Sequence, residues 1–125
     1  MRERGNSTVE FTLVSVLLVG LFLAVLQLGF VLHTRNVLVA SAQEGARYGA
    51  NADRGVADAR ARTREVVAAA LSPDVAGRMS YEAQQVVRGG LTTVEVTVQG
   101  PLPLVFLPAG PLQLSVRGHA LEESR

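Results

Sequence analysis

The feature that most constrains this chain is an uncharged apolar run near its start. Phe11 to Leu32 contains 22 residues and no charged side chain. As an α-helix the run would be about 33 Å long, against about 30 Å for the hydrocarbon core of a bilayer. The run therefore predicts a membrane-spanning helix. Glu10 directly precedes it, and a carboxylate at the mouth of such a helix is costly enough to indicate a function.

The charges that flank the run indicate an orientation. Arg2 and Arg4 precede it, which by the positive-inside rule places the N-terminus in the cytoplasm. Arg35 and Arg47 follow the run and weaken this argument. We expect a single-pass protein with its head outside the cytoplasmic membrane.

A secretory signal cleaved after Ala42 is an alternative to the uncleaved anchor. Ala40-Ser41-Ala42 has the small-x-small pattern of a signal-peptidase site. However, the apolar run is longer than the about 7–15 residues of a usual signal, and Arg35 lies before the candidate site. We therefore favour an anchor that is uncleaved or trimmed at its N-terminus.

Helical character continues beyond the apolar run, since no proline occurs from 34 to 50. Ala42, Gly45, Ala46 and Gly49 follow the spacing i, i+3, i+4, i+7, so they form one narrow stripe on a helix. We call these four residues the small-residue stripe. Such a stripe allows another backbone to approach closely. The neighbour is either the chain's own head or a second molecule.

The head, residues 51–125, begins with turn residues and one helix. Asn51 to Gly55 is typical of a turn, with Asp53 as a candidate helix cap. Val56 to Leu71 has the pattern of an amphipathic helix, and Ser72-Pro73 ends it.

Alternating residues then predict a short antiparallel sheet. Val94 to Val98 and Leu112 to Val116 alternate apolar and polar side chains. Met79 to Val87 is a candidate third strand, followed by a turn at 88–90. Four prolines within Gly100 to Pro111 exclude a central strand there, which predicts a loop. Its apolar tip, Leu104 to Leu107, would cover the head's own core or bind a partner.

Together these elements predict an α+β fold. A long N-terminal hydrophobic, transmembrane helix extends into a small head, which contains one amphipathic helix and a short antiparallel β-sheet.

Composition argues against several functions. The net charge is +1, with no face-long basic run for nucleic acid. The chain has no cysteine and two histidines, His33 and His119, so we expect no disulfide, no metal site and no cofactor. No nucleophile–base spacing or phosphate-binding glycine loop is present. We therefore expect no catalytic residues and no enzymatic activity.

Short motifs around the apolar run resemble those of a known family. They are Arg4-Gly5, Val9-Glu10-Phe11, Arg35-Asn36 and Glu44-Gly45-Ala46-Arg47-Tyr48. Over roughly residues 3–50 the chain resembles the TadE-like proteins, which are minor pilins (pseudopilins) of the tight-adherence (Tad, or Flp) pilus system. The head is less diagnostic and only agrees with the family.

The resemblance implies processing by a prepilin peptidase after Gly5, which would leave Asn6 as the new N-terminus. Residues 1–5 would then be the leader, 6–50 the transmembrane helix with its extension, and 51–125 the extracytoplasmic head. Glu10 and Phe11 would stand fifth and sixth in the mature chain, at the positions that set assembly and helix register. The implied partners are the cytoplasmic membrane, the peptidase, other pilins and the assembly machinery.

Simple electrostatics supports a role for Glu10 after such a cut. The new α-amine titrates near 8 in model peptides and is largely cationic at neutral pH. Glu10 would lie one helical turn away, or opposite the amine of a neighbouring subunit. Two other interpretations stay open: a membrane-anchored binding module that does not polymerise, and a protein secreted after cleavage at Ala42. A mature chain would start at Asn6 for the pilin, Met1 for the anchor and Gln43 for the secreted form.

Overall fold

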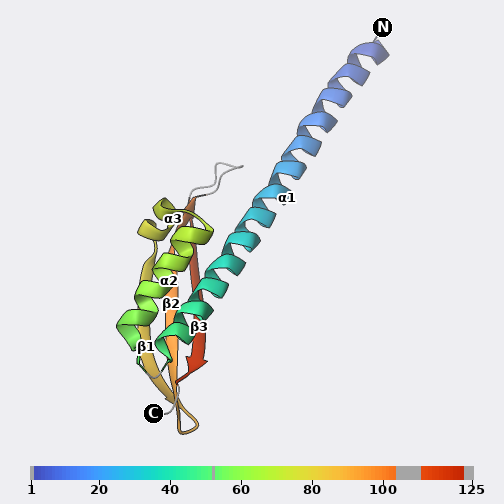
Figure 1. Ribbon diagram of the computed structural model, residues 1–125. Coiled ribbons are helices and arrows are strands. Elements are labelled where there is room, and N and C mark those ends of the chain that lie inside the picture. Colours follow the sequence, from blue (N-terminus) through green and yellow to red (C-terminus); the bar gives the residue numbers. More distant parts are fainter. Residues whose placement is uncertain (1, 52, 104–110, 123–125) are drawn as a thin grey trace.

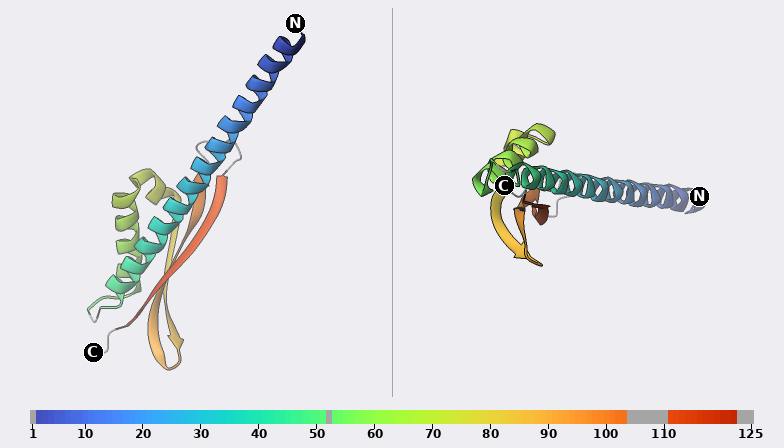
Figure 2. Two further views of the ribbon diagram at one scale, coloured as in Figure 1. Left: turned by 90° about the vertical axis from the view of Figure 1, so that its right-hand side faces the viewer. Right: turned by 60° about the horizontal axis from the view of Figure 1, so that its bottom comes forward.

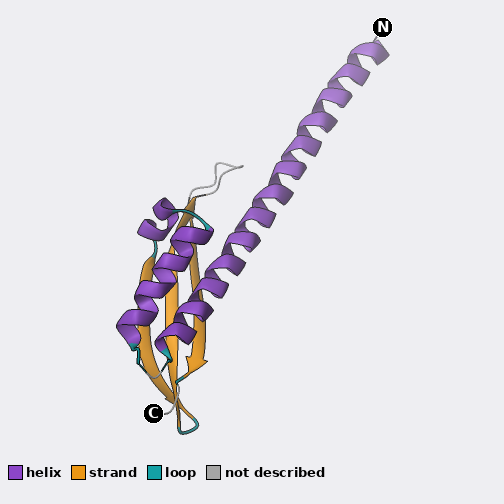
Figure 3. Cartoon of the chain, viewed as in Figure 1, coloured by secondary structure: helices purple, strands orange, loops and turns teal. Residues whose placement is uncertain are grey.

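The computed structural model describes residues 2–51, 53–103 and 111–122. The chain folds into three helices followed by three strands (Figures 1 and 3). The elements are α1 (Arg2–Gly49), α2 (Val56–Ala70), α3 (Pro73–Arg78), β1 (Ser80–Arg88), β2 (Leu91–Pro103) and β3 (Pro111–Leu121). The predicted α+β class, with a long N-terminal apolar helix and an antiparallel sheet, is confirmed.

The helix α1 is continuous over 48 residues and is therefore about 72 Å long. Its N-terminal half projects away from the head, and its C-terminal half packs against the head (Figures 1 and 2). Along α1, Gln27 is the first buried residue among those whose side chains are described. From there to Gly49 the helix has one buried face, so a single element serves two different environments.

The head contains one three-stranded antiparallel sheet in the order β1-β2-β3. Helices cover one face of this sheet, and its other face is open (Figure 2). The turn between β1 and β2 is formed by Gly89 and Gly90, whose φ angles are 58° and 80°. Two-residue hairpin turns with positive φ match the twist of the strands, and glycine adopts them without steric cost.

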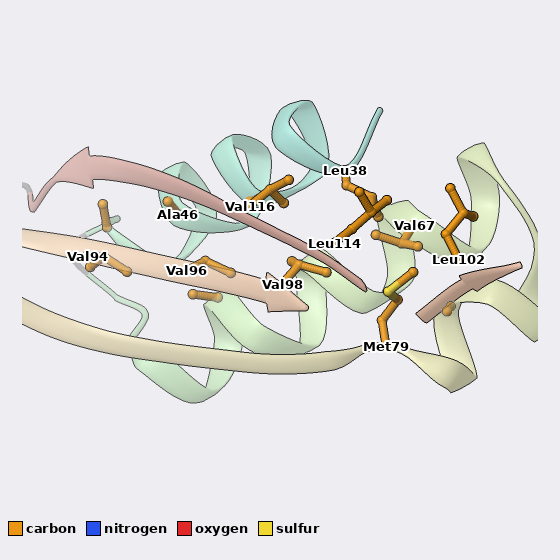
Figure 4. Close-up of a cluster of buried hydrophobic side chains, with 14 residues drawn as sticks. Leu38, Ala46, Val67, Met79, Val94, Val96, Val98, Leu102, Leu114 and Val116 are labelled. Atoms are coloured by element: carbon orange, nitrogen blue, oxygen red, sulfur yellow. The ribbon is translucent and has the colours of Figure 1, made fainter. Parts of the chain in front are cut away.

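The core forms where α1, α2 and the covered face of the sheet meet. Val94, Val96 and Val98 on β2 are fully buried, as their alternation with polar residues predicts. Leu38 of α1 lies near Val67 of α2 and Leu114 of β3 (Figure 4). The C-terminal part of α1 is therefore an integral part of the folded head.

The start of α2 differs in detail from the prediction. Gly55, not Asp53, is the N-cap residue, and its backbone N–H donates to the Asp58 carboxylate over 3.0 Å. Asp58 lies in the first turn, where a negative charge favours the helix N-terminus. Helix α2 ends at Ala70, one residue before the predicted end.

A short helix, α3, was not predicted after α2. Ser72 and Pro73, interpreted only as the end of a helix, also begin this new one. The Ser72 hydroxyl accepts a hydrogen bond from the Val75 backbone N–H over 3.1 Å, and Pro73 occupies the first turn, where its missing N–H costs nothing.

The prediction that all of Gly100 to Pro111 is a loop was wrong at both ends. β2 continues to Pro103, and β3 begins at Pro111. The register explains why prolines are tolerated, because the pairing of β1 with β2 ends at Ser80 opposite Gln99. Beyond that point β2 pairs with β3 alone, so a proline lies on an edge there. The predicted apolar tip, 104–107, lies outside the described residues.

Candidate functional site

The projecting part of α1, residues 5–26, carries the predicted processing and assembly residues. Gly5, Asn6, Glu10 and Phe11 are all exposed, Phe11 to 75%. A Cβ atom added at Gly5 would meet no atom within 4 Å. Within the described residues no ion pair involves Glu10. The structure thus brings these four residues together at one helix end and away from the head.

The projecting segment is apolar around its whole circumference. Its large exposed side chains are Val9, Phe11, Leu13, Val14, Val16, Leu17, Leu18, Val19, Leu21, Phe22, Val25 and Leu26. An apolar surface of this extent marks contact with a membrane or with other proteins. Among the described residues, α1 is the one helix that is long and apolar enough to cross a membrane.

The small-residue stripe lies at the other end of α1 and is buried against the chain's own head. A Cβ atom on Gly45 would lie 2.8 Å from the Ala59 carbonyl oxygen and would collide with the Thr63 hydroxyl. A Cβ atom on Gly49 would collide with the Ala59 side chain. α2 therefore packs directly on the backbone of α1 at these positions.

The sheet approaches the same stripe from its other side. A Cβ atom on Gly118 of β3 would lie 2.8 Å from the carbonyl oxygen of Ala42 and would collide with the backbone of α1. Ala42 and Ala46 are fully buried. The stripe therefore lies between α2 and β3. Of the two neighbours that the sequence left open, the chain's own head and a second molecule, the structure places the head there.

Polar contacts around the stripe involve the Glu44 to Tyr48 motif. Arg62 of α2 lies 3.7 Å from the Glu44 carboxylate and 3.0 Å from the Glu65 carboxylate. The Arg54 guanidinium lies 4.0 Å from the centre of the Tyr48 ring, within the range of a cation–π contact. The motif thus contacts the head at the end of α1.

Three residues of this contact were missed by sequence reasoning. Gly118 carried a usable signal, because an isolated glycine in a strand pattern suggests close backbone approach. Thr63 lies within the predicted amphipathic helix, and its hydroxyl donates to the Ala59 carbonyl over 2.8 Å. The role of Arg62 depends on Glu44, and nothing in the sequence relates the two.

Two of the head's cavities are lined by described residues, and a partly buried phenol borders one of them. A cavity of about 390 Å³ between α2 and β1 is lined by Arg60, Arg64 and Tyr81, among others. Burial raises the pKa of Tyr81, an effect that the nearby Arg64 partly offsets. The Tyr81 hydroxyl donates to the Ala76 carbonyl over 2.8 Å. The second cavity, of about 360 Å³, lies at the junction of α1 with α2 and α3.

The two histidines do not form a shared site. His33 lies on α1, and His119 lies on β3 in register with Glu95 of β2. Across the described ranges, no group of three or more His, Asp or Glu side chains is arranged to hold a metal ion.

Comparison with known proteins finds a match over most of α1, which carries the projecting segment and the small-residue stripe. The model of the TadE-like protein family matches residues 5–47, about a third of the chain. No curated protein and no solved structure matches the chain. The matched range runs from Gly5, through Glu10 and the apolar run, to the contact with the head. Over this segment the chain is similar to the TadE-like proteins, as the resemblance in the sequence indicated.

Proposed function

We propose that this chain is a pilin-like structural subunit of a Tad-type pilus, anchored by α1 and matured by a prepilin peptidase. The observation that supports this best is the division of α1 into two parts. The projecting segment carries Glu10 and an apolar surface on every side, while the stripe is already occupied by the head. The chain therefore offers its N-terminal half for assembly.

Processing after Gly5 is consistent with the local structure. Gly5 and Asn6 are exposed, and both are weak helix formers, glycine by about 1 kcal/mol relative to alanine. A peptidase needs an extended substrate, and local unwinding costs least where helix propensity is low. Removal of residues 1–5 would take away Arg2, Glu3 and Arg4 and create an α-amine at Asn6.

The new amine and Glu10 would then be the main charges of the embedded helix. Within the hydrocarbon core both groups need a partner, because an isolated buried charge is strongly destabilising. Pairing between the Glu10 of one subunit and the amine of a neighbour would satisfy both and set the register between helices. Exposed apolar residues on either side, such as Phe11, would complete the helix contact.

The experiment that tests this proposal is the replacement Glu10→Ala in the producing strain. We expect normal cleavage after Gly5, because the scissile bond is unchanged, but loss of assembled pili. If the amine is desolvated, leaving it unpaired costs about 3–5 kcal/mol. Electron microscopy counts pili, and mass spectrometry verifies processing.

Glu82→Ala is the matched control, since Glu82 is an exposed carboxylate on β1 of the head. It should leave pilus numbers unchanged. Normal piliation in the Glu10→Ala strain would contradict the proposed role of this residue and would favour a non-polymerising anchor.

A further inference from the structure

The head begins to pack on α1 before the apolar run has ended. Gln27 is 7% exposed and Thr34 is 2% exposed, and Phe30 and Val31 are packed against the hydrophobic core. The part of the run that lies before these residues, Phe11 to Leu26, is only about 24 Å long. This is shorter than the about 30 Å of hydrocarbon that a spanning helix crosses.

The depth of the head in the bilayer follows from this mismatch. When the run from Phe11 fills the hydrocarbon core, the boundary falls close to Leu32, and Arg35 is the first charged residue beyond it. The end of the head that faces the N-terminal half of α1 is then at the level of the lipid headgroups. Tilt of α1 would place it deeper, because a tilted helix needs more residues to cross the core.

A cavity opens at this same level. It has a volume of about 360 Å³ and is lined by residues of α1, α2, the α2–α3 connection, α3 and β2. Phe30, Leu71, Val75 and Leu102 supply apolar walls, and His33 and Ser72 supply polar groups. Its size falls within the about 300–1,000 Å³ of small-molecule sites. Apolar walls with a few polar groups suit a molecule that is itself amphipathic.

We propose that this cavity is a phospholipid-binding site, in which an acyl chain contacts the apolar walls while the headgroup lies near His33 and Ser72. The inference rests on the membrane-spanning role proposed above. It adds that the head is not held clear of the membrane by α1 but is in direct contact with the outer leaflet. Lipid bound there would fix the tilt of the head relative to the membrane.

Tryptophan fluorescence in vesicles tests the position of the cavity, because the chain contains no tryptophan. Ala70→Trp places the probe at the cavity and Ala57→Trp places it near the other end of α2, about 20 Å away. Both alanines are exposed. Phospholipids with brominated acyl chains should quench the Ala70→Trp probe at least about twofold more than the Ala57→Trp probe, since only the former is near hydrocarbon.

A third variant separates this inference from the proposed function. Leu18→Trp lies in the middle of the apolar run and should be strongly quenched if α1 spans the bilayer. Quenching at Leu18 without quenching at Ala70 would overturn the lipid site and leave the anchor intact. No quenching at Leu18 would overturn the spanning helix itself. A third outcome is that the Ala70→Trp probe is shielded from water, but that this shielding disappears when the protein is diluted in lipid. This result would assign the cavity to a second copy of the chain and would equally overturn the proposal.

Native mass spectrometry of the whole chain released from detergent tests binding itself. The wild type should retain a phospholipid, and Val75→Trp should lose it because the indole fills the cavity. Val86→Trp is the matched control, since Val86 is also half-buried but lies on β1, away from the cavity. Equal retention by the two variants, or a wild type without lipid, would contradict the site.

Discussion

At the scale of single residues, neither Gly5 nor Glu10 contributes to packing in the isolated chain. A Cβ atom at Gly5 would meet nothing, and Glu10 is exposed. No requirement of the fold therefore explains why a glycine and a carboxylate stand at these positions. The proposed processing and assembly would explain both residues.

We expect Gly5→Phe to block maturation, because a bulky side chain would occupy the position next to the scissile bond. The uncleaved chain should accumulate in the membrane with its N-terminal residues intact. Mass spectrometry of the purified protein measures this directly. The matched control is Gly20→Phe, which lies in the same helix, also with nothing near its Cβ position, and should be cleaved normally. A Gly5→Phe protein that starts at Asn6 would contradict the proposed requirement for glycine at the cleavage site.

Tyr81 gives a prediction for the dependence of stability on pH. Burial raises the pKa of Tyr81 above its usual value near 10, so the folded state favours the neutral phenol. The stability that it contributes is present below about pH 10 and is lost as the pH rises through the raised pKa.

We therefore expect Tyr81→Phe to lower the free energy of unfolding by about 1 kcal/mol at neutral pH, the net contribution of one hydrogen bond. The difference from wild type should shrink as the pH rises above about 10, because the variant has no phenol to ionise at this position. Denaturant unfolding of the detergent-solubilised chain at several pH values measures both effects. A gap that widens at alkaline pH would contradict the assignment.

At the scale of secondary-structure elements, α1 combines an exposed apolar half with a half that completes the head. The contact of α1 with α2 and β3 depends on the absence of side chains at Gly45 and Gly118. Close approach of backbones buries more surface, but it leaves no room for even one added methyl group.

We expect Gly45→Ala to destabilise the head by about 1–3 kcal/mol, because the methyl group would overlap Thr63 and the Ala59 carbonyl. Each kcal/mol lowers the unfolding temperature of a domain of this size by about 4–8 °C. Circular dichroism in detergent measures the shift. Gly20→Ala should have no such effect, since nothing lies near Gly20; equal shifts in the two variants would contradict the packing argument.

Several elements could be predicted from the sequence because one local pattern determined each of them. The apolar run predicted the helix, and the alternation at Val94, Val96 and Val98 predicted a buried strand. The length of β2 could not be predicted, because its tolerance of Pro101 and Pro103 depends on where β1 ends. This is a property of strand pairing and is not visible in either strand alone.

The same limit applies to the candidate site. The spacing of the small-residue stripe indicated a close helix contact, but the partner could not be named, since the head and a second molecule would use the same chemistry. The cap at α2 was assigned to Asp53, although Asp58 accepts the hydrogen bond from Gly55. Both acidic residues lie near the turn, and only the backbone geometry distinguishes them.

At the scale of the whole molecule, the head and the projecting segment have separate tasks. The head buries the stripe and packs against one face of the C-terminal half of α1 (Figure 1). The N-terminal half is left with an apolar surface that only lipid or other helices can cover. This division supports a membrane-anchored, pilin-like subunit in which the helix directs assembly and the head is carried by it.

The most direct test of this account is the N-terminal residue of the chain isolated from native membranes. Intact-mass and N-terminal peptide measurements read it without any mutation. We predict a start at Asn6, with residues 1–5 removed. A chain that starts at Met1 would indicate a permanent anchor, and one that starts at Gln43 would indicate a secreted protein; either result would contradict the proposed maturation.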